Sequence, residues 1–297
     1  MADATASLRR KIGSATDLQS VVRAMKAQAA ASVGQYRQSV AALGAYALSV
    51  EAGLGVCFRL DAPALATAPP PRRADRGVVR AVVFGSDQGL VGRFNDIVLD
   101  HARAALPGGS RFWAVGERIE ASLVDSGTPP LGAFAVPGSV QGIAALVGEL
   151  LPAVIAEAGA PELTGAAAEV HLFYNRPTSG SSYAPVGQRL LPLDERWRRE
   201  LALRSWPGTV LPEVLGSQAA TLGALIREYL FVSIFRACAE SLASENASRL
   251  AAMERADLNI DKMLGTLQDR FHHLRQDSID EELSDVISGF RARGANG

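Results

Sequence analysis

Residues 4–56 read ATASLRRKIGSATDLQSVVRAMKAQAAASVGQYRQSVAALGAYALSVEAGLGV and contain no proline. Residues 216–292 contain none either, and every proline of the chain lies between positions 63 and 212. Proline interrupts a helix interior at a cost of roughly 3 kcal/mol. The two proline-free stretches therefore predict two long terminal helices, about 80 and about 110 Å in length at 1.5 Å per residue.

Apolar residues recur along both predicted helices at spacings that alternate between three and four. This alternation is typical of a coiled-coil seam, so the two helices are predicted to pair with each other in opposite directions. Gln19 and Lys26 interrupt the seam of the first helix. The seam residues are Leu8, Ile12, Ala15, Val22, Ala29, Val33, Tyr36, Val40, Leu43, Ala47 and Val50 in the first helix, and Met253, Ala256, Ile260, Met263, Leu267, Arg270 or Phe271, and Leu274 in the last.

The pairing leaves part of the longer helix without a partner. If both helices leave the centre of the chain at one end, Val56 lies opposite Gly216 and Ala4 lies opposite Gln268. The residues beyond position 268 then project past the first helix. Their apolar stripe consists of Ile279, Leu283, Val286, Ile287 and Phe290. An uncovered apolar stripe predicts contact with another chain, although this end could also fold back or fray.

The middle of the chain alternates between β-branched apolar runs and helical patterns. Strands are predicted at 78–84, 111–115, 133–136 and 169–174, with an edge strand at 184–193, and helices at 95–106, 117–126 and 140–158. Alternation of this kind predicts a mostly parallel sheet with helices on both faces. The expected fold class is α/β, with an antiparallel coiled coil of the terminal helices attached to a central Rossmann-like domain.

These patterns divide the chain into four predicted parts. Residues 1–59 form the N-terminal coiled-coil helix, 60–76 a proline-rich linker, 77–212 the central α/β domain, and 213–297 the C-terminal helix with its apolar tip. The composition is ordinary for a soluble protein, with 48% apolar and 21% charged residues. A net charge of −1 gives no general reason to bind nucleic acid.

Two further features bear on compartment. Cys57 and Cys238 lie far apart in the sequence, which favours a reducing cytoplasmic environment. We find no uninterrupted apolar run of the roughly 18–20 residues that a membrane-spanning helix needs.

The loop 84–95, FGSDQGLVGRFN, lies between a predicted strand and a predicted helix. Glycine-rich loops in this position can cradle phosphate on a helix N-terminus. This loop lacks the GxGxxG spacing and has no following Lys-Ser/Thr, so tight turns and close packing are the favoured explanation. His272 and His273 are adjacent on a predicted helix, where their side chains diverge by about 100° and cannot chelate one metal. No catalytic, cofactor or metal site is predicted.

Three separated stretches resemble the gamma subunit of the rotary ATP synthase. The opening helix LRRKIGSATDLQSVVRAMKAQAAAS resembles the family's R-x-I-x-S-…-T-Q-K-I-T-x-A-M-x-M-V-A, and GSDQGLVGRFN resembles S-D-R-G-L-C-G-G-F-N. Near the C-terminus, ESLASENASRLAAMERADLNIDKM and RQDSIDEELSDVISG resemble two consecutive family segments. Order and spacing hold over the whole chain. Gln88, Val91, Arg93 and Asp280 depart from the pattern, which indicates a divergent bacterial form.

The resemblance implies a rotor. In the family, the two terminal helices lie inside a ring of alternating alpha and beta subunits, and the α/β domain sits with the epsilon subunit on the ring of c subunits. The resemblance thus implies a non-catalytic subunit that couples ion flow to ATP synthesis or hydrolysis. It implies a peripheral location on the cytoplasmic face of the bacterial inner membrane.

The resemblance also implies residue roles. Met25, Arg249, Arg275 and Gln276 match positions that contact beta-subunit loops, and Leu283, Val286, Ile287 and Phe290 match the apolar tip that turns in a bearing. One alternative is a nucleotide-binding α/β enzyme with coiled-coil oligomerisation arms. Another is a structural coiled-coil tether, which does not explain the three motif matches.

Overall fold

A computed structural model describes residues 2–60, 78–158, 169–178, 182–206, 208–210, 212–214 and 216–294. The chain forms two compact units: a helix-pair unit of residues 1–29 with 250–297, and an α/β unit of residues 30–249. Helices α1 (Ala2–Leu60) and α7 (Gln218–Gly294) contribute to both units. The division into units therefore falls inside the two long helices, whereas the sequence-based division follows their ends. Beyond Leu60, the predicted linker at 60–76 lies outside the described residues.

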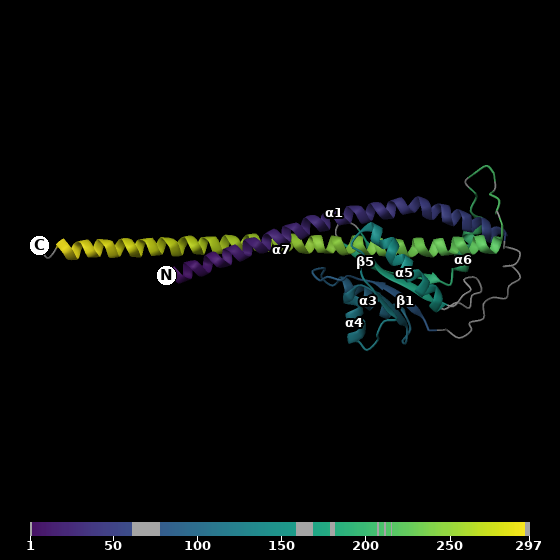
Figure 1. The fold of residues 1–297 in the computed structure, drawn as a ribbon, viewed down its shortest axis with the longest axis horizontal. Helices are drawn as coiled ribbons and strands as arrows, with labels where there is room; N and C mark the ends of the chain where they lie inside the picture. The colour runs from purple at the N-terminus through teal and green to yellow at the C-terminus, as the bar shows by residue number, and fades with distance from the viewer. Residues whose placement is uncertain are drawn as a thin grey trace. The chain divides into compact units, whose positions relative to one another are not determined.

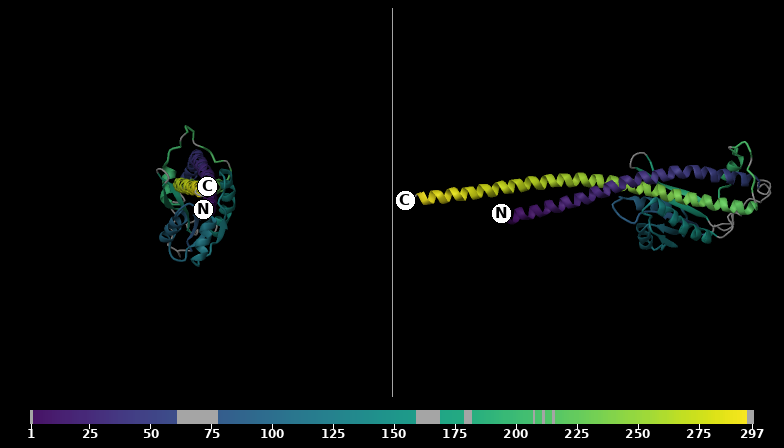
Figure 2. Two further views of the ribbon diagram at one scale, coloured as in Figure 1. Left: turned by 90° about the vertical axis from the view of Figure 1, so that its left-hand side faces the viewer. Right: turned by 45° about the horizontal axis from the view of Figure 1, so that its top comes forward.

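The two long helices predicted from the proline-free stretches are confirmed. In the helix-pair unit, α1 and α7 lie side by side and run in opposite directions (Figure 2). Their buried seam consists of Ala15 and Val22 from α1 and Met253, Ile260 and Leu264 from α7. The seven-residue spacing from Ala15 to Val22 and from Met253 to Ile260 is the coiled-coil period that the sequence predicts.

Two details of the predicted seam are wrong. Leu264, 9% exposed, takes the seam position predicted for Met263, which is 44% exposed. The guanidinium of Arg9 lies 5.6 Å from the ring centre of Phe271, about two helical turns away from the predicted register. That register assumed that α1 and α7 begin pairing at Val56 and Gly216, whereas α1 extends to Leu60 and α7 begins at Gln218.

Among the described residues, the sheet has five strands in the order β3-β2-β1-β4-β5. Strands β1 (Arg80–Phe84), β2 (Arg111–Val115), β3 (Gly132–Phe134) and β4 (Val170–Pro177) run parallel, and β5 (Tyr183–Leu191) pairs antiparallel with β4. Val82 lies opposite Trp113 on one side and Leu172 on the other. The predicted mostly parallel sheet with an antiparallel edge strand is confirmed.

Alternate residues of β1 and β2 face two different hydrophobic cores. Ala81 and Val83 pack with helices α3 (Phe94–Ala105) and α4 (Glu117–Asp125). Val82 and Phe84 face α5 (Val140–Ala158) and the α/β-unit portions of α1 and α7. Helices α3 and α4 therefore lie on one face of the sheet and α5 lies on the other, as β-strand alternation requires (Figure 1).

Sequence analysis did not predict helix α6 (Glu195–Leu203), which packs against the end of α1. Its Trp197 ring contacts Phe58 and Tyr229, with ring centres 6.3 and 4.6 Å apart. A Cβ added at Gly55 would lie 2.7 Å from the carbonyl oxygen of Leu201, so this position accepts only glycine without a shift of the backbone. Arg59 also donates a hydrogen bond to the carbonyl oxygen of Ala202.

Among the described residues, two helices are long and apolar enough by composition to cross a membrane, contrary to the sequence-based expectation. Eighteen-residue windows reach a mean hydropathy of 1.6 in Ala4–Leu60 and 1.5 in Val140–Glu157. Core helices of soluble proteins meet the same criterion, and α5 buries Ile143, Val147 and Leu150 fully in the α/β unit. Uninterrupted apolar runs were too strict a guide, because a window keeps a high mean hydropathy when single polar or small residues interrupt its apolar run.

Candidate functional site

The predicted contact residues are divided between the two units. Met25, Arg275 and Gln276 belong to the helix-pair unit, and Arg249 belongs to the α/β unit. Each position is therefore described within its own unit, beginning with the seam of the helix pair.

Met25 is half-buried against the seam of the helix-pair unit, where it packs on the cluster that includes Val22 and Met253. Its remaining surface is available to another chain. The adjacent seam positions are polar: the Gln19 side-chain amide donates to the carboxylates of Asp257, at 3.2 Å, and Asp261. A polar pair within a coiled-coil seam specifies register, and this pair explains the interruption of the apolar stripe at Gln19.

Asp257 is the centre of a charged cluster on this seam. Arg23 Nε donates to its carboxylate at 3.1 Å, and Lys26 Nζ lies 3.9 Å away. Burial favours a higher pKa for Asp257, but the hydrogen bond and charge of Arg23, the Gln19 amide and the charge of Lys26 together lower the pKa below its usual value. The carboxylate is therefore ionised at neutral pH and holds α1 and α7 in register.

Arg275 and Gln276 are both exposed on α7. Within the described ranges, the structure gives Arg275 no ion pair with Asp277 or Asp280, whose spacings from it face poorly on a helix. Its guanidinium is thus presented outward from the helix. The outward position agrees with the predicted contact role but does not itself identify a partner.

The C-terminal stripe of α7 is uncovered. Leu283, Val286 and Ile287 are 57%, 56% and 46% exposed, and Ile279 is 52% exposed. The backbone of Phe290 lies in α7, but its side chain lies outside the described residues. Exposed stripes of large apolar side chains are typical of surfaces that contact another chain.

Arg249 differs from the other predicted contacts because its own chain already binds it. Its side chain is 13% exposed, and Nη2 donates at 2.7 Å to Glu245, whose side chain is 6% exposed. Burial raises the pKa of Glu245; the charge and hydrogen bond of Arg249 act in the opposite direction, and the charge of Asp87 adds to the rise. Glu245 Oε2 and Arg249 Nε are buried without a hydrogen-bond partner among the described residues.

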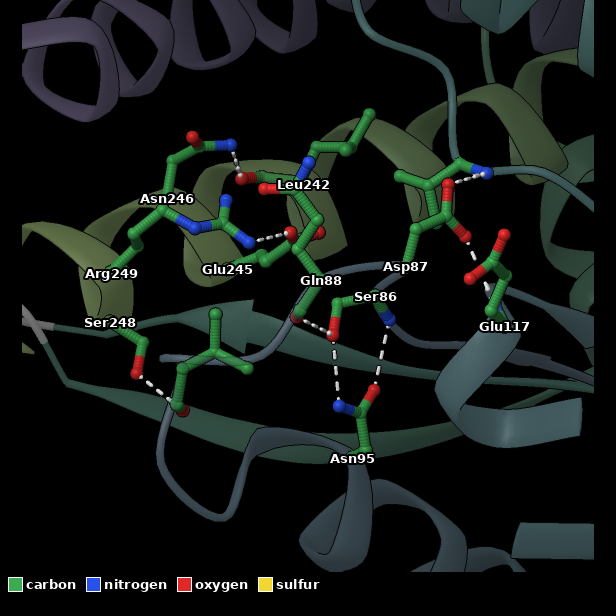
Figure 3. A network of polar contacts seen from close by, with 12 residues as sticks. Ser86, Asp87, Gln88, Asn95, Glu117, Leu242, Glu245, Asn246, Ser248 and Arg249 are labelled. Carbon is green, nitrogen blue, oxygen red and sulfur yellow. Dashed lines mark hydrogen bonds and ion pairs between the residues drawn. The ribbon is translucent and has the colours of Figure 1, made fainter. Parts of the chain in front are cut away.

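The glycine loop after β1 is held by its own polar side chains (Figure 3). Asn95 Oδ1 accepts a hydrogen bond from Ser86 N at 2.9 Å, and Asn95 Nδ2 donates to Ser86 Oγ at 2.9 Å. The two oxygens of Asp87 accept hydrogen bonds from the backbone N–H groups of Glu117 and Val136, each at 3.0 Å. These bonds join the loop to the beginning of α4 and to the end of β3.

The same loop is joined to α7 by hydroxyl groups. Ser248 Oγ donates to the carbonyl oxygen of Val91 at 2.8 Å (Figure 3), and Ser244 Oγ donates to that of Asn175 at 2.9 Å. Asn175 Nδ2 in turn donates to the carbonyl oxygen of Phe94. Sequence analysis gave these serines no role, although they lie in the motif ESLASENASR. Two of the stretches that resemble the family therefore pack against each other.

This geometry argues against a phosphate cradle in the loop. The backbone N–H groups of Ser86 and Glu117, which could bind a phosphate, already donate to Asn95 and Asp87. The first turn of α3 also carries the acidic Asp96, which disfavours an anion there. A Cβ at Gly116, whose φ is +111°, would lie 2.9 Å from the backbone of Ser86, so glycine serves close packing here. No group of three or more potential metal ligands occurs among the described residues.

Comparison with known proteins gives one consistent result. A family model described as ATP synthase matches residues 4–292. The ATP synthase gamma chain of Anaeromyxobacter dehalogenans is 31% identical, over 96% of this chain and 98% of its own length. The gamma chain of Heliobacterium modesticaldum is 30% identical, over 97% and 98% of the two chains.

Solved structures share the fold. A chain of the Euglena gracilis mitochondrial ATP synthase, determined with OSCP, F1 and the c-ring, has a TM-score of 0.61 at 16% identity and covers 100% of this chain and 96% of that one. A chain of the Tetrahymena thermophila mitochondrial ATP synthase, from the central stalk and c-ring, has a TM-score of 0.57 at 20% identity over 80% and 99%.

Proposed function

Because this chain belongs to the family of ATP synthase gamma chains, we propose that it is the central rotor shaft of a rotary ATP synthase. It couples ion flow through the membrane sector to ATP synthesis or hydrolysis at the beta subunits. The observation that carries the proposal is the match over residues 4–292, which spans both long helices and the α/β elements between them. The fold shared with solved rotor chains supports it.

The chain is a subunit of an enzyme complex, and we assign the chemistry itself to the beta subunits. The glycine loop supports a non-catalytic role because Asn95 and Asp87 already accept hydrogen bonds from the N–H groups of Ser86 and Glu117. Alpha and beta subunits surround the paired helices, and the epsilon subunit and c ring lie at the α/β domain. We place the chain peripherally on the cytoplasmic face of the bacterial inner membrane.

The contact residues take separate roles in this proposal. Met25, Arg275 and Gln276 contact beta-subunit loops from exposed or half-buried positions on the helix pair. Arg249 is also a proposed contact, but an acidic loop must then share its guanidinium with Glu245 or replace that carboxylate. Leu283, Val286, Ile287 and Phe290 form the apolar bearing tip.

Co-expression with the alpha and beta subunits of the same organism tests the rotor role. The chain should co-purify with them and restore rapid ATP hydrolysis, whereas alpha and beta subunits without it provide the control. The isolated chain should aggregate or form oligomers, because its apolar tip is uncovered. A nucleotide-binding isotherm of the isolated chain with a micromolar Kd, together with failure to co-purify, would instead support a nucleotide-binding enzyme.

A further inference from the structure

Every seventh residue of α1 from Ala15 to Val50 is buried, with one exception. Ala15, Val22, Ala29, Tyr36 and Val50 are each between 1% and 6% exposed. Leu43 occupies the heptad position between Tyr36 and Val50, yet it is only half-buried. A coiled-coil seam position without cover marks a place where the side chains of α1 and α7 do not meet.

A cavity of about 230 Å³ lies beside Leu43, within the α/β unit. Its apolar walls include Val40, Leu43 and Ala47 of α1 and Val232 of α7. It opens past Gly44, which is exposed and has no atom within 4 Å of the place where a Cβ would lie. The short side chains of α1 thus leave space that a packed seam would fill.

The Arg236 side of the cavity carries an excess of positive charge. Arg236 lines the cavity, and its Nε donates at 2.8 Å to Glu240, whose side chain is 8% exposed. The other oxygen of Glu240 accepts a hydrogen bond from Arg176 Nε at 2.7 Å. One carboxylate thus serves two guanidinium groups, so an anion at this side would be electrostatically favoured.

The Glu51 side is different. Glu51 lines the cavity, but its carboxylate already accepts a hydrogen bond from Arg204 at 2.8 Å. Tyr229 is a further lining residue, and its hydroxyl group is hydrogen-bonded to Ser233. Tyr229 and Arg236 are seven residues apart on α7, or about 10 Å at 1.5 Å per residue. The cavity therefore runs along the helices. Arg236 and the paired Glu51 both line it, together with apolar side chains and the polar Gln188 and Ser233.

We propose that this cavity binds a short linear aliphatic monocarboxylate, with its chain along Leu43 and Ala47 and its carboxylate on Arg236. A guanidinium can bind a carboxylate with two parallel hydrogen bonds, which a compact cation or an uncharged alcohol cannot reproduce. The volume lies below the roughly 300–1,000 Å³ of pockets for drug-sized ligands, so a single short chain fits better than a ring system. The bound chain replaces the missing contact between α1 and α7. The site is independent of the rotor role.

Isothermal titration of the full chain with octanoate tests the proposal, both in isolation and in the complex with alpha and beta subunits. One octanoate per chain should bind in both cases. Ala47→Leu fills the cavity and should weaken binding at least tenfold. Ala45→Leu is the matched control, because Ala45 is exposed and does not line the cavity; it should bind octanoate as the unaltered chain does.

Octanol and octylamine separate charge recognition from non-specific apolar binding. Arg236→Gln should weaken octanoate binding about tenfold and leave octanol binding unchanged, and octylamine should bind the unaltered chain more weakly than octanoate. The proposal fails if octanoate does not bind, if Ala47→Leu binds it as Ala45→Leu does, or if octylamine binds equally well. Binding to the isolated chain but not to the complex would also overturn it, because a partner subunit would then cover the cavity.

Discussion

In the helix-pair unit, α1 and α7 bury five apolar residues against each other, and Gln19 and Arg23 bind the carboxylates of α7 from the other helix. In the α/β unit, the same two helices pack into a large core with α5 and the sheet, and α7 also buries Ser244 and Glu245 near the glycine loop. The first arrangement leaves large apolar side chains in contact with water, among them Val21 and Leu283.

This difference teaches which part of the chain depends on other subunits. The α/β unit buries large apolar clusters within the chain, although its surface also exposes Leu48, Leu90 and Leu203. The helix pair has a thin seam, and its outward surface carries the exposed residues for which contacts are proposed. Substitutions in the α/β unit should therefore lower the stability of the chain, and those on the helix pair should act mainly on the assembled complex.

The same substitution made in both units gives the largest expected contrast. Leu54 is 0% exposed in the core of the α/β unit, and Leu264 is 9% exposed in the seam of the helix pair. Leu54→Ala should lower the free energy of unfolding by about 3–5 kcal/mol, because the surrounding core cannot close the cavity. Leu264→Ala should cost closer to 2 kcal/mol, because two helices can shift together.

Urea unfolding followed by circular dichroism measures both effects. Leu258→Ala is the control, since this leucine is 62% exposed, and it should change the unfolding free energy by less than about 0.5 kcal/mol. Equal losses for Leu54→Ala and Leu264→Ala would contradict the distinction between a rigid core and a thin seam.

Arg275→Ala tests the contact surface of the helix pair. Loss of a charge-assisted bond to a beta-subunit carboxylate should cost about 1–3 kcal/mol of contact energy. Turnover of the assembled complex should fall severalfold, with little change in nucleotide affinity. Arg255→Ala is the matched control, because Arg255 is also exposed on α7 and no contact is proposed for it. Wild-type turnover of the Arg275 variant across a range of loads would remove Arg275 from the contact set.

Met25→Lys tests whether the exposed part of the Met25 side chain contacts another subunit during rotation. Met25 is half-buried, and a lysine there can keep its aliphatic stem on the seam while its ammonium reaches a partner. The new charge should form or repel contacts during rotation. ATP hydrolysis should continue while ion pumping per ATP falls, as measured in membrane vesicles. Unchanged pumping would place Met25 outside the coupling surface.

The main elements of the fold were predictable because local patterns determine them. The absence of proline from 4–56 and 216–292 predicted α1 and α7, and strand β2 was predicted with the bounds Arg111–Val115 that the structure shows. These patterns depend on residues close in sequence. The heptad spacing of Ala15 and Val22 predicted the seam for the same reason.

The missed features depend on tertiary contacts. Helix α6 is short and charged, and it is stabilised by Trp197 against Phe58, a contact that no periodicity announces. For Arg249, the resemblance indicated a partner contact, whereas the structure pairs the side chain with Glu245. Their i, i+4 spacing was an available signal for this ion pair. The burial of this pair depends on the contact between α7 and the glycine loop. Spacing within the sequence does not predict that contact.

Glu245→Gln examines the polar junction of the α/β unit. The pKa of Glu245 is raised by burial, so the native chain binds its proton more tightly than the unfolded chain, where a glutamate titrates near about 4.3. Between that pH and the raised native pKa, the free energy of unfolding should fall as pH rises. The difference in the free energy of unfolding, wild type minus Glu245→Gln, should therefore fall as pH rises through this window. Above the window the difference should be constant. Glu254→Gln, at an exposed position of α7, is the control for the change in charge.

Two glycines of α1 give the smallest expected contrast. Glycine costs about 1 kcal/mol relative to alanine in a helix interior. A Cβ at Gly13, in the helix pair, would meet no atom within 4 Å, so Gly13→Ala should raise the free energy of unfolding by about 0.5–1 kcal/mol. At Gly53, in the α/β unit, a Cβ would lie 3.2 Å from Leu225 Cδ1, and moving that side chain should cancel most of the gain. Urea unfolding compares the two variants. An equal rise in the free energy of unfolding for Gly53→Ala would show that Leu225 moves aside at little cost.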